Sequence, residues 1–600
     1  MSKRLSAPKH QCVFVILTFV VSFSYLSNIL YAADSSAINE VELKQIQDWQ
    51  KIATELEKNG DFTEAHTTYE KIIQAYSKTS YGLDACTKDA RLYVKQNYFD
   101  NLIPSVEQIC TDYKEQQYAA HAVSDIARDC MFSKFYSKAI EICQKGIEQL
   151  YEHPRKLLLY GTLGMIYATE GDIENAEQIK QLILHQEECI ASDFLKAIGD
   201  IGWGYYCSGE LDRAIATYRQ GLELNSTHIG AIHLQYQIVR AYVTRGDLVS
   251  ADREMDVLLA EYSQREQTPW LALRLASRDY KKQDLESTIN VYDKLLVQFA
   301  GHSIVPSIRD AIVSAYADAG DLAKAREALQ VDIEQCPYRS ELLRVITRIA
   351  VDTARAGDTE IAMELVETIF NQNPEGADQL LFGYTTLARV YAYQGKDTDV
   401  TATYKEALEL FKDHPDSLSY HLFGVGEEYY LMAQKAVQNQ ETAQATRYYQ
   451  QAIDKWNSID FDRLPSRKAI DGYYSLGDCY RKTGNYKESN YYFKKVVAQS
   501  GDQALASKAL LVVAKNFRDM GNTSQIQSLS PVDPNSIVVA DVSVCVDPNG
   551  TIASGLVFGD NNRCCKLNIN SETDAYKYLA DNYPETQAGE FARHFLNRRK

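Results

Sequence analysis

The stretch AIDGYYSLGDCYRKTGNYKESNYYFKKVV, residues 469–497, contains two apolar stripes separated by a glycine. In its first half Tyr473, Leu476 and Tyr480 recur three to four residues apart, and the second half repeats that spacing. Apolar residues at this spacing lie on one face of an α-helix. Gly484 between the stripes provides the left-handed residue that ends a helix. The stretch therefore predicts two helices joined by a tight turn.

The same pattern recurs along the chain with a nearly constant period. A glycine at the turn, followed mostly by Asp, Glu or Asn, stands at Gly60, Gly171, Gly209, Gly246, Gly320, Gly357, Gly395 and Gly484. A residue that is mostly small follows each turn, at Ala65, Leu102, Ala139, Ala176, Ala214, Ala251, Thr288, Ala325, Ala362, Val400, Ala445 and Ser489. The intervals are 37 or 38 residues up to Val400, then 45 and 44. Such a period indicates a repeat architecture, so we predict an all-α superhelical solenoid of about twelve helix pairs over residues 41–521.

The motif Tyr473-x2-Leu476-Gly477-x2-Tyr480 resembles the tetratricopeptide repeat. The resemblance covers about residues 45–520, and it implies a solenoid of helix pairs whose surface binds other proteins. The period departs from the roughly 34 residues of that family. We therefore expect the extra residues to lengthen the turns between repeats or the helix ends. The longer late intervals predict an eleventh helix pair that extends beyond its neighbours.

Residues 1–33 have the pattern of an export signal. Lys3, Arg4 and Lys9 precede an apolar run, which ends in the small residues Ala32 and Ala33. A basic start, an apolar stretch and a small-residue exit are typical of a secretory signal peptide. An uncleaved N-terminal membrane anchor is the alternative, because about 20 apolar residues can span a bilayer. In either case we expect the rest of the chain to be periplasmic or extracellular.

The C-terminal part departs from the helical period. Residues 530–570 are rich in valine and contain Asp547-Pro548-Asn549-Gly550, which predicts a β-hairpin or meander inserted after the solenoid. Residues 571–600 then predict two helices that cap the array, since a solenoid needs a covering element at its end. Their Tyr583-Pro584-Glu585 junction is similar to the Tyr-Pro-Asp links of bacterial periplasmic repeat proteins. A docking module is the alternative role for residues 530–570.

Composition and motifs argue against several function classes. A chain that is 45% hydrophobic and 24% charged is neither mostly disordered nor a polytopic membrane protein. The net charge of −18 opposes binding to nucleic acid. The sequence contains no phosphate loop, no zincin motif, no nucleophile elbow and no Cys-x-x-Cys, so we expect no enzyme, no cofactor and no metal site. If export allows disulfides, Cys86 with Cys110 is the best pair.

The resemblance also implies a binding groove, because in that family the first helix of each repeat lines a concave surface. Carried onto this chain, those helix positions contain no acid in repeats three to seven. They carry arginine and aromatic residues, the types that dominate binding hot spots. The predicted groove residues are Arg128, Lys196, Trp203, Tyr206, Tyr236, Arg240, Trp270 and Tyr280. Packing of these side chains against neighbouring helices or against each other is the alternative.

From these features we expect an exported scaffold that binds a protein or peptide along its groove, with a role in assembling a bacterial cell envelope. Its partner is expected to carry acidic and apolar groups, because arginine holds carboxylates and aromatic rings hold apolar side chains. Recognition of an acidic envelope polysaccharide along the same groove is the alternative function. The sequence does not distinguish the two.

Overall fold

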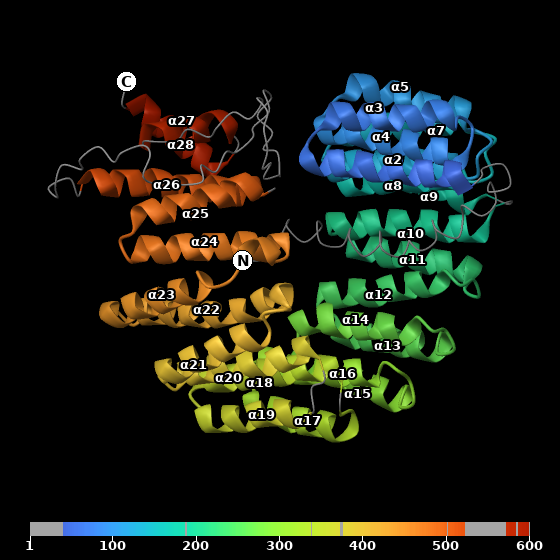
Figure 1. Ribbon diagram of the computed structural model, residues 1–600. Coiled ribbons are helices and arrows are strands. Elements are labelled where there is room, and N and C mark those ends of the chain that lie inside the picture. Colours follow the sequence, from blue (N-terminus) through green and yellow to red (C-terminus); the bar gives the residue numbers. More distant parts are fainter. Residues whose placement is uncertain are drawn as a thin grey trace. The chain divides into compact units, whose positions relative to one another are not determined.

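The computed structural model describes residues 40–186, 189–337, 339–372, 376–500, 502–522, 572–583 and 586–598. Within these residues every regular element is a helix, and the helices follow one another in chain order (Figure 1). They fall into two compact units, one up to Ile308 and the other from Arg309 onward.

The first unit consists of helix pairs in which a first helix packs against the second helix that follows it. Its elements are α2 (Glu40–Asn59), α3 (Phe62–Ala75), α4 (Ser80–Gln96), α5 (Phe99–Asp112), α6 (Ala119–Phe132), α7 (Tyr136–Gln149), α8 (Leu157–Glu170), α9 (Ile173–Leu184), α10 (Ala191–Ser208), α11 (Leu211–Asn225), α12 (Ala231–Arg245), α13 (Leu248–Glu261), α14 (Thr268–Arg278), the 3₁₀ turn η2 (Tyr280–Lys282) and α15 (Leu285–Gln298).

The boundary between the units lies within α16 (Val305–Asp318). The second unit continues the alternation of first and second helices. Its further elements are α17 (Leu322–Gln335), α18 (Ser340–Ala356), α19 (Thr359–Asn371), α20 (Ala377–Tyr393), α21 (Asp397–Leu410), α22 (Pro415–Gln438), α23 (Thr442–Trp456), the 3₁₀ turn η3 (Phe461–Arg463), α24 (Ser466–Lys482), α25 (Tyr486–Gln499), α26 (Gln503–Asn522), α27 (Glu572–Asn582) and α28 (Gln587–Arg598).

The turn within each pair is built as the sequence predicts. All eight glycines of the turn pattern have positive φ, from 71° at Gly395 to 109° at Gly357. In three repeats that lack this glycine, Asn97, Lys134 or Gln440 takes the left-handed conformation instead, whereas Gln283 before α15 has a φ of −101°. The left-handed conformation costs these three residues conformational energy, and the helix pair forms nevertheless, because packing of the two helices outweighs it.

The twelve residues that follow the turns form the seam of each pair. All of them, from Ala65 to Ser489, are at most 3% exposed. A small side chain at this position lets the two helices approach closely. Large side chains such as Tyr205, Tyr218 and Tyr292 are also fully buried, so tyrosine fills much of the space between helices.

Side chains connect the turns between repeats to one another. Gln116 Nε2 donates to the carbonyl oxygen of Lys78 at 2.6 Å, and Arg265 Nη2 donates to that of Thr227 at 3.0 Å. His153 Nε2 hydrogen-bonds to the carbonyl oxygen of Gln116 at 3.1 Å. These contacts tie each of these turns to the turn of the preceding repeat.

The late, longer repeat is also as predicted, because α22 has 24 residues where α20 has 17. Two helices, α27 and α28, stand where the sequence places the C-terminal pair. The predicted signal at residues 1–33 and the predicted β-hairpin within residues 530–570 lie outside the described residues. In the described part of the chain, no helix combines the length and the apolar character that a bilayer crossing requires.

Candidate functional site

The eight predicted groove residues all lie in the first unit. Arg128 is on α6, Lys196, Trp203 and Tyr206 are on α10, Tyr236 and Arg240 are on α12, Trp270 is on α14, and Tyr280 is in η2. These elements are first helices or, for η2, the end of one. We call the surface that the first helices α6, α8, α10, α12 and α14 form the inner face.

Close contact between α8 and α10 shapes the inner face. A methyl group added at Gly161 would lie 2.4 Å from Ala197 Cα, and one added at Gly204 would lie 2.5 Å from the carbonyl oxygen of Met165. Because neither glycine has a side chain, the two helix backbones approach more closely than side chains would allow. This approach brings α6 and α10, which lie on either side of α8, within reach of each other.

The first charged cluster joins α6 to α10. Arg128 Nη2 donates to Asp200 Oδ2, and Lys196 Nζ lies 3.3 Å from the same oxygen. Arg128 also contacts Thr162 Oγ1 on α8 at 3.4 Å. Burial, with the nearby Arg128 charge, lowers the pKa of Lys196. Arg128 and Lys196 therefore share one internal carboxylate, which the prediction of an acid-free groove overlooked.

The second charged cluster joins α10, α12 and the end of α14. Arg240 lies over the ring of Tyr206, with 4.5 Å between the guanidinium carbon and the ring centroid. Its Nε lies 3.7 Å from Asp279 Oδ1, and Arg278 Nε lies 3.5 Å from the same oxygen. The side chains of Arg240 and Asp279 are only 7% and 10% exposed. Arg240 therefore packs between helices, which is the alternative that the sequence left open for the groove residues.

The aromatic residues divide into buried and accessible ones. Tyr236 is 6% exposed and Tyr280 is fully buried, so both serve packing. Trp270 is 46% exposed. Trp203 is half-buried and meets Phe132 edge-on, with 6.0 Å between the ring centroids. Phe132 is 37% exposed and was not among the predicted residues.

Trp203 and Phe132 form what we call the inner aromatic pair. Like the first charged cluster, this pair joins α6 to α10 across α8. The inner aromatic pair remains partly open to solvent beside charges that are already paired. With Trp270, it is an accessible aromatic part of the inner face.

The cysteines and the acidic side chains were also considered as disulfide and metal sites. Cys86 and Cys110, the best candidate pair for a disulfide, are free thiols. Cys86 Sγ lies 4.0 Å from the carbonyl oxygen of Ser105 and from Gln108 Oε1, and burial raises the pKa of both thiols to about 12. Among the described residues, no group of three His, Cys, Asp or Glu side chains is arranged to hold a metal ion.

Comparison with known families decides the type of repeat. The family model described as tetratricopeptide repeat matches residues 430–504, from late α22 to the start of α26. These residues are tetratricopeptide repeats. Arrays of this type are scaffolds for protein–protein interaction and are generally not enzymes. The same glycine turn and buried small residue continue through the helix pairs of both units.

Two solved structures are similar to parts of the chain. One is a tetratricopeptide repeat protein from Parabacteroides merdae ATCC 43184, with 13% identity, a TM-score of 0.23, and coverage of 44% of this chain and 98% of that chain. The other is the APC/C hetero-tetramer Cut9–Hcn1, with 12% identity, a TM-score of 0.24, and coverage of 79% and 90%. No curated protein matches the sequence.

Proposed function

We propose that this protein is an exported scaffold that binds a protein or peptide at the inner face of its first unit. The observation that carries the proposal is the inner aromatic pair, Phe132 and Trp203, which is partly exposed and held rigidly between two helices. Aromatic side chains in such a setting contribute most to binding at protein interfaces. A bulky apolar side chain of the partner packs against this pair.

The charged clusters narrow the chemistry of the partner. Arg128, Lys196 and Arg240 each face a carboxylate of this chain. A partner carboxylate would have to displace Asp200 or Asp279 from these cations. We therefore propose a partner defined chiefly by its apolar group, with acidic groups in a secondary role.

The test uses the full chain and its native cell-envelope fraction. Phe132→Ala together with Trp203→Ala should weaken capture of the partner by roughly 1–3 kcal/mol, because both rings leave the interface. Val249→Ala on α13, where the side chain is 75% exposed, is the control and should bind as the wild type does. Equal binding by the double variant and the wild type, with unchanged melting, would refute this site.

Export is the second part of the proposal, and it is supported by the signal pattern of residues 1–33. Mass spectrometry of the full chain produced in a bacterial host should find a mature N-terminus near Ala33, in the periplasmic fraction. A full-length chain that sediments with the membrane would support the N-terminal anchor instead. A full-length chain in the cytoplasm would contradict export.

Binding of an acidic envelope polysaccharide remains the alternative function. Aromatic rings stack on sugars, but such a polymer also needs cations that are free to meet its carboxylates. The paired state of Arg128, Lys196 and Arg240 weighs against it. Binding of the full chain to uronate polymers on a glycan array, lost in Trp203→Ala, would favour the polysaccharide over the protein partner.

A further inference from the structure

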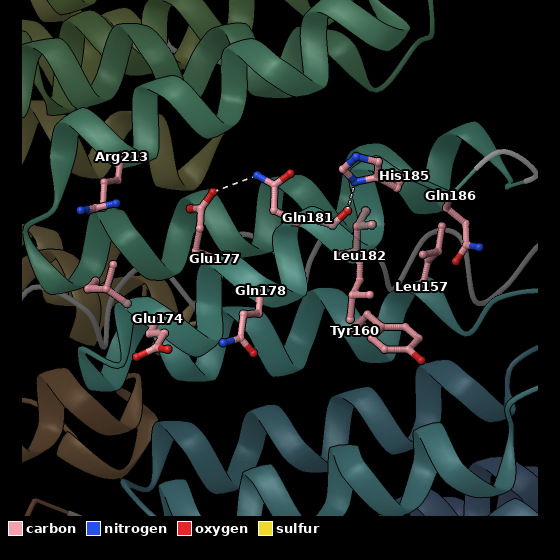
Figure 2. A pocket seen from close by; sticks show the side chains of 12 residues that line it. Leu157, Tyr160, Glu174, Glu177, Gln178, Gln181, Leu182, His185, Gln186 and Arg213 are labelled. Atoms are coloured by element: carbon pink, nitrogen blue, oxygen red, sulfur yellow. Dashed lines mark hydrogen bonds between the residues drawn. The ribbon is translucent and has the colours of Figure 1, made fainter.

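A cleft lies between α9 and α11, the second helices of two successive repeats in the first unit. Its volume is about 990 Å³, and it is lined from α8, α9, the turn after α9, and α11 (Figure 2). Leu157 and Ile183 are buried beneath it. Leu182 is 58% exposed, which is high for a leucine at the wall of a cleft.

The register of the repeats explains why this cleft is open. In α7 and α15, the sixth residue after the buried small residue is a lysine that bridges to the preceding second helix. Lys145 pairs with Glu107 on α5, and Lys294 pairs with Asp256 on α13. The residue at the same register of α9 is Leu182, which forms no ion pair. An apolar side chain therefore stands where α7 and α15 carry a bridging cation.

The opposite end of the cleft is acidic. Glu174 is exposed, and Glu177 accepts hydrogen bonds from Gln181 at 3.0 Å and from Lys180 at 2.8 Å. Burial raises the pKa of Glu177, but the bonds from Lys180 and Gln181 outweigh it and hold the pKa below its usual value. Arg213 across the cleft is already paired with Glu210.

These two ends are separated by a fixed distance. From Glu174 to Leu182 is eight residues of one helix, or about 12 Å. The lining thus offers an apolar contact and a carboxylate contact that are about two helical turns apart. A complementary segment carries the opposite charge at the same separation.

We propose that the α9–α11 cleft docks an amphipathic helix of a partner protein, which carries a bulky apolar residue and a lysine or arginine about two turns apart. The apolar residue packs on Leu182 and Leu157. The cation pairs with the exposed Glu174, because Glu177 is already paired with Lys180. This surface is separate from the inner aromatic pair, so a scaffold that uses both holds two partners at once.

The test measures fluorescence anisotropy with the full chain and two labelled, alanine-rich helical peptides. In one peptide, each of two leucines is followed eight positions later by a lysine. The second peptide has glutamates in place of the lysines and is otherwise identical. We expect the lysine peptide to bind at least tenfold more tightly than the second peptide, a difference of about 1.4 kcal/mol. Equal affinities, or no binding of the lysine peptide, would overturn the proposal.

A matched pair of variants locates the binding. Leu182→Lys introduces the residue type that stands at this register in α7 and α15, and it should weaken the lysine peptide at least tenfold. Leu224→Lys on α11 is the control, because Leu224 is also 58% exposed but does not line the cleft. If both variants weaken binding equally, or neither does, while both melt as the wild type does, the cleft is not the docking site.

Discussion

The inner and outer faces of the first unit use the same repeat to make two different surfaces. On the inner face, Arg128 reaches Asp200 two repeats later, and charged side chains fill the space between the helices. On the outer face, ion pairs such as Lys145–Glu107 join adjacent second helices, and the exposed side chain of Leu182 lines the cleft between α9 and α11. Contact across two repeats requires first helices to lie on the inside of a curve.

This difference separates charged residues that hold the array together from those that are free to bind. Arginine on the inner face is buried and paired, so its removal should change stability. Arginine on the outer face is exposed and worth little to stability. A charged residue at a groove position therefore identifies a binding residue only after its internal partner is known.

The largest expected effect is that of Arg240→Glu. The substitution removes the partner of Asp279 and places a second carboxylate beside it in a buried site. We expect a loss of about 3–5 kcal/mol in the free energy of unfolding, the range for a broken buried ion pair. Urea denaturation measures it. Arg219→Glu on α11, where the side chain is 47% exposed, is the control and should cost about 1 kcal/mol or less. If the two variants unfold alike, Arg240 is not a structural residue.

A smaller effect is expected for Gly161→Ala. The added methyl group would meet the backbone of Ala197 at 2.4 Å, so α8 and α10 must move apart. Overpacking of this kind costs about 1–3 kcal/mol. Gly301→Ala, where the new methyl group would contact nothing within 4 Å, is the control in the same melting experiment. Equal melting temperatures for the two variants would show that the close contact of α8 with α10 does not support the inner face.

The smallest effect is a pH dependence that comes from His121. Burial, together with the charges of Arg155, Lys196 and Arg128, lowers its pKa to about 2. The imidazole of His121 takes up its proton in the unfolded state at about pH 6.5, but in the folded state only near pH 2. The folded protein is therefore most stable above pH 6.5, and its free energy of unfolding decreases as the pH falls toward 2. Between pH 6.5 and 5.5 we expect a loss of about 1 kcal/mol in the free energy of unfolding. His121→Gln should flatten this part of the stability profile, whereas His185→Gln, at an exposed site, should leave it unchanged.

The sequence predicted the helix pairs because their signals are local. The turn glycines and the small residues from Ala65 to Ser489 act within one repeat, and each takes the conformation or burial that the pattern implies. The tetratricopeptide resemblance at Tyr473–Tyr480 falls inside the span that the family model matches. The roles of residues 1–33 and 530–570 remain predictions.

The partners of the groove residues could not be predicted, because they depend on curvature. Asp200 lies three residues before Trp203, outside the helix positions that line the groove in the resembled family. It meets Arg128 only because the glycine contacts of Gly161 and Gly204 bring three first helices together. Asp279 likewise meets Arg240 from the end of α14. The repeat period determines the helix face on which a residue lies, but it does not determine which other repeat the side chain will contact.

The central claim is that the charges of the inner face hold its helices together, and a double-mutant cycle on Arg128 and Asp200 tests it most directly. The free energy of unfolding is measured for Arg128→Ala, Asp200→Ala, the double variant and the wild type. The account predicts that each single variant loses stability and that the two effects are coupled by about 1–3 kcal/mol. Additive effects, with a coupling energy below about 0.3 kcal/mol, would contradict it and return Arg128 to the set of candidate binding residues.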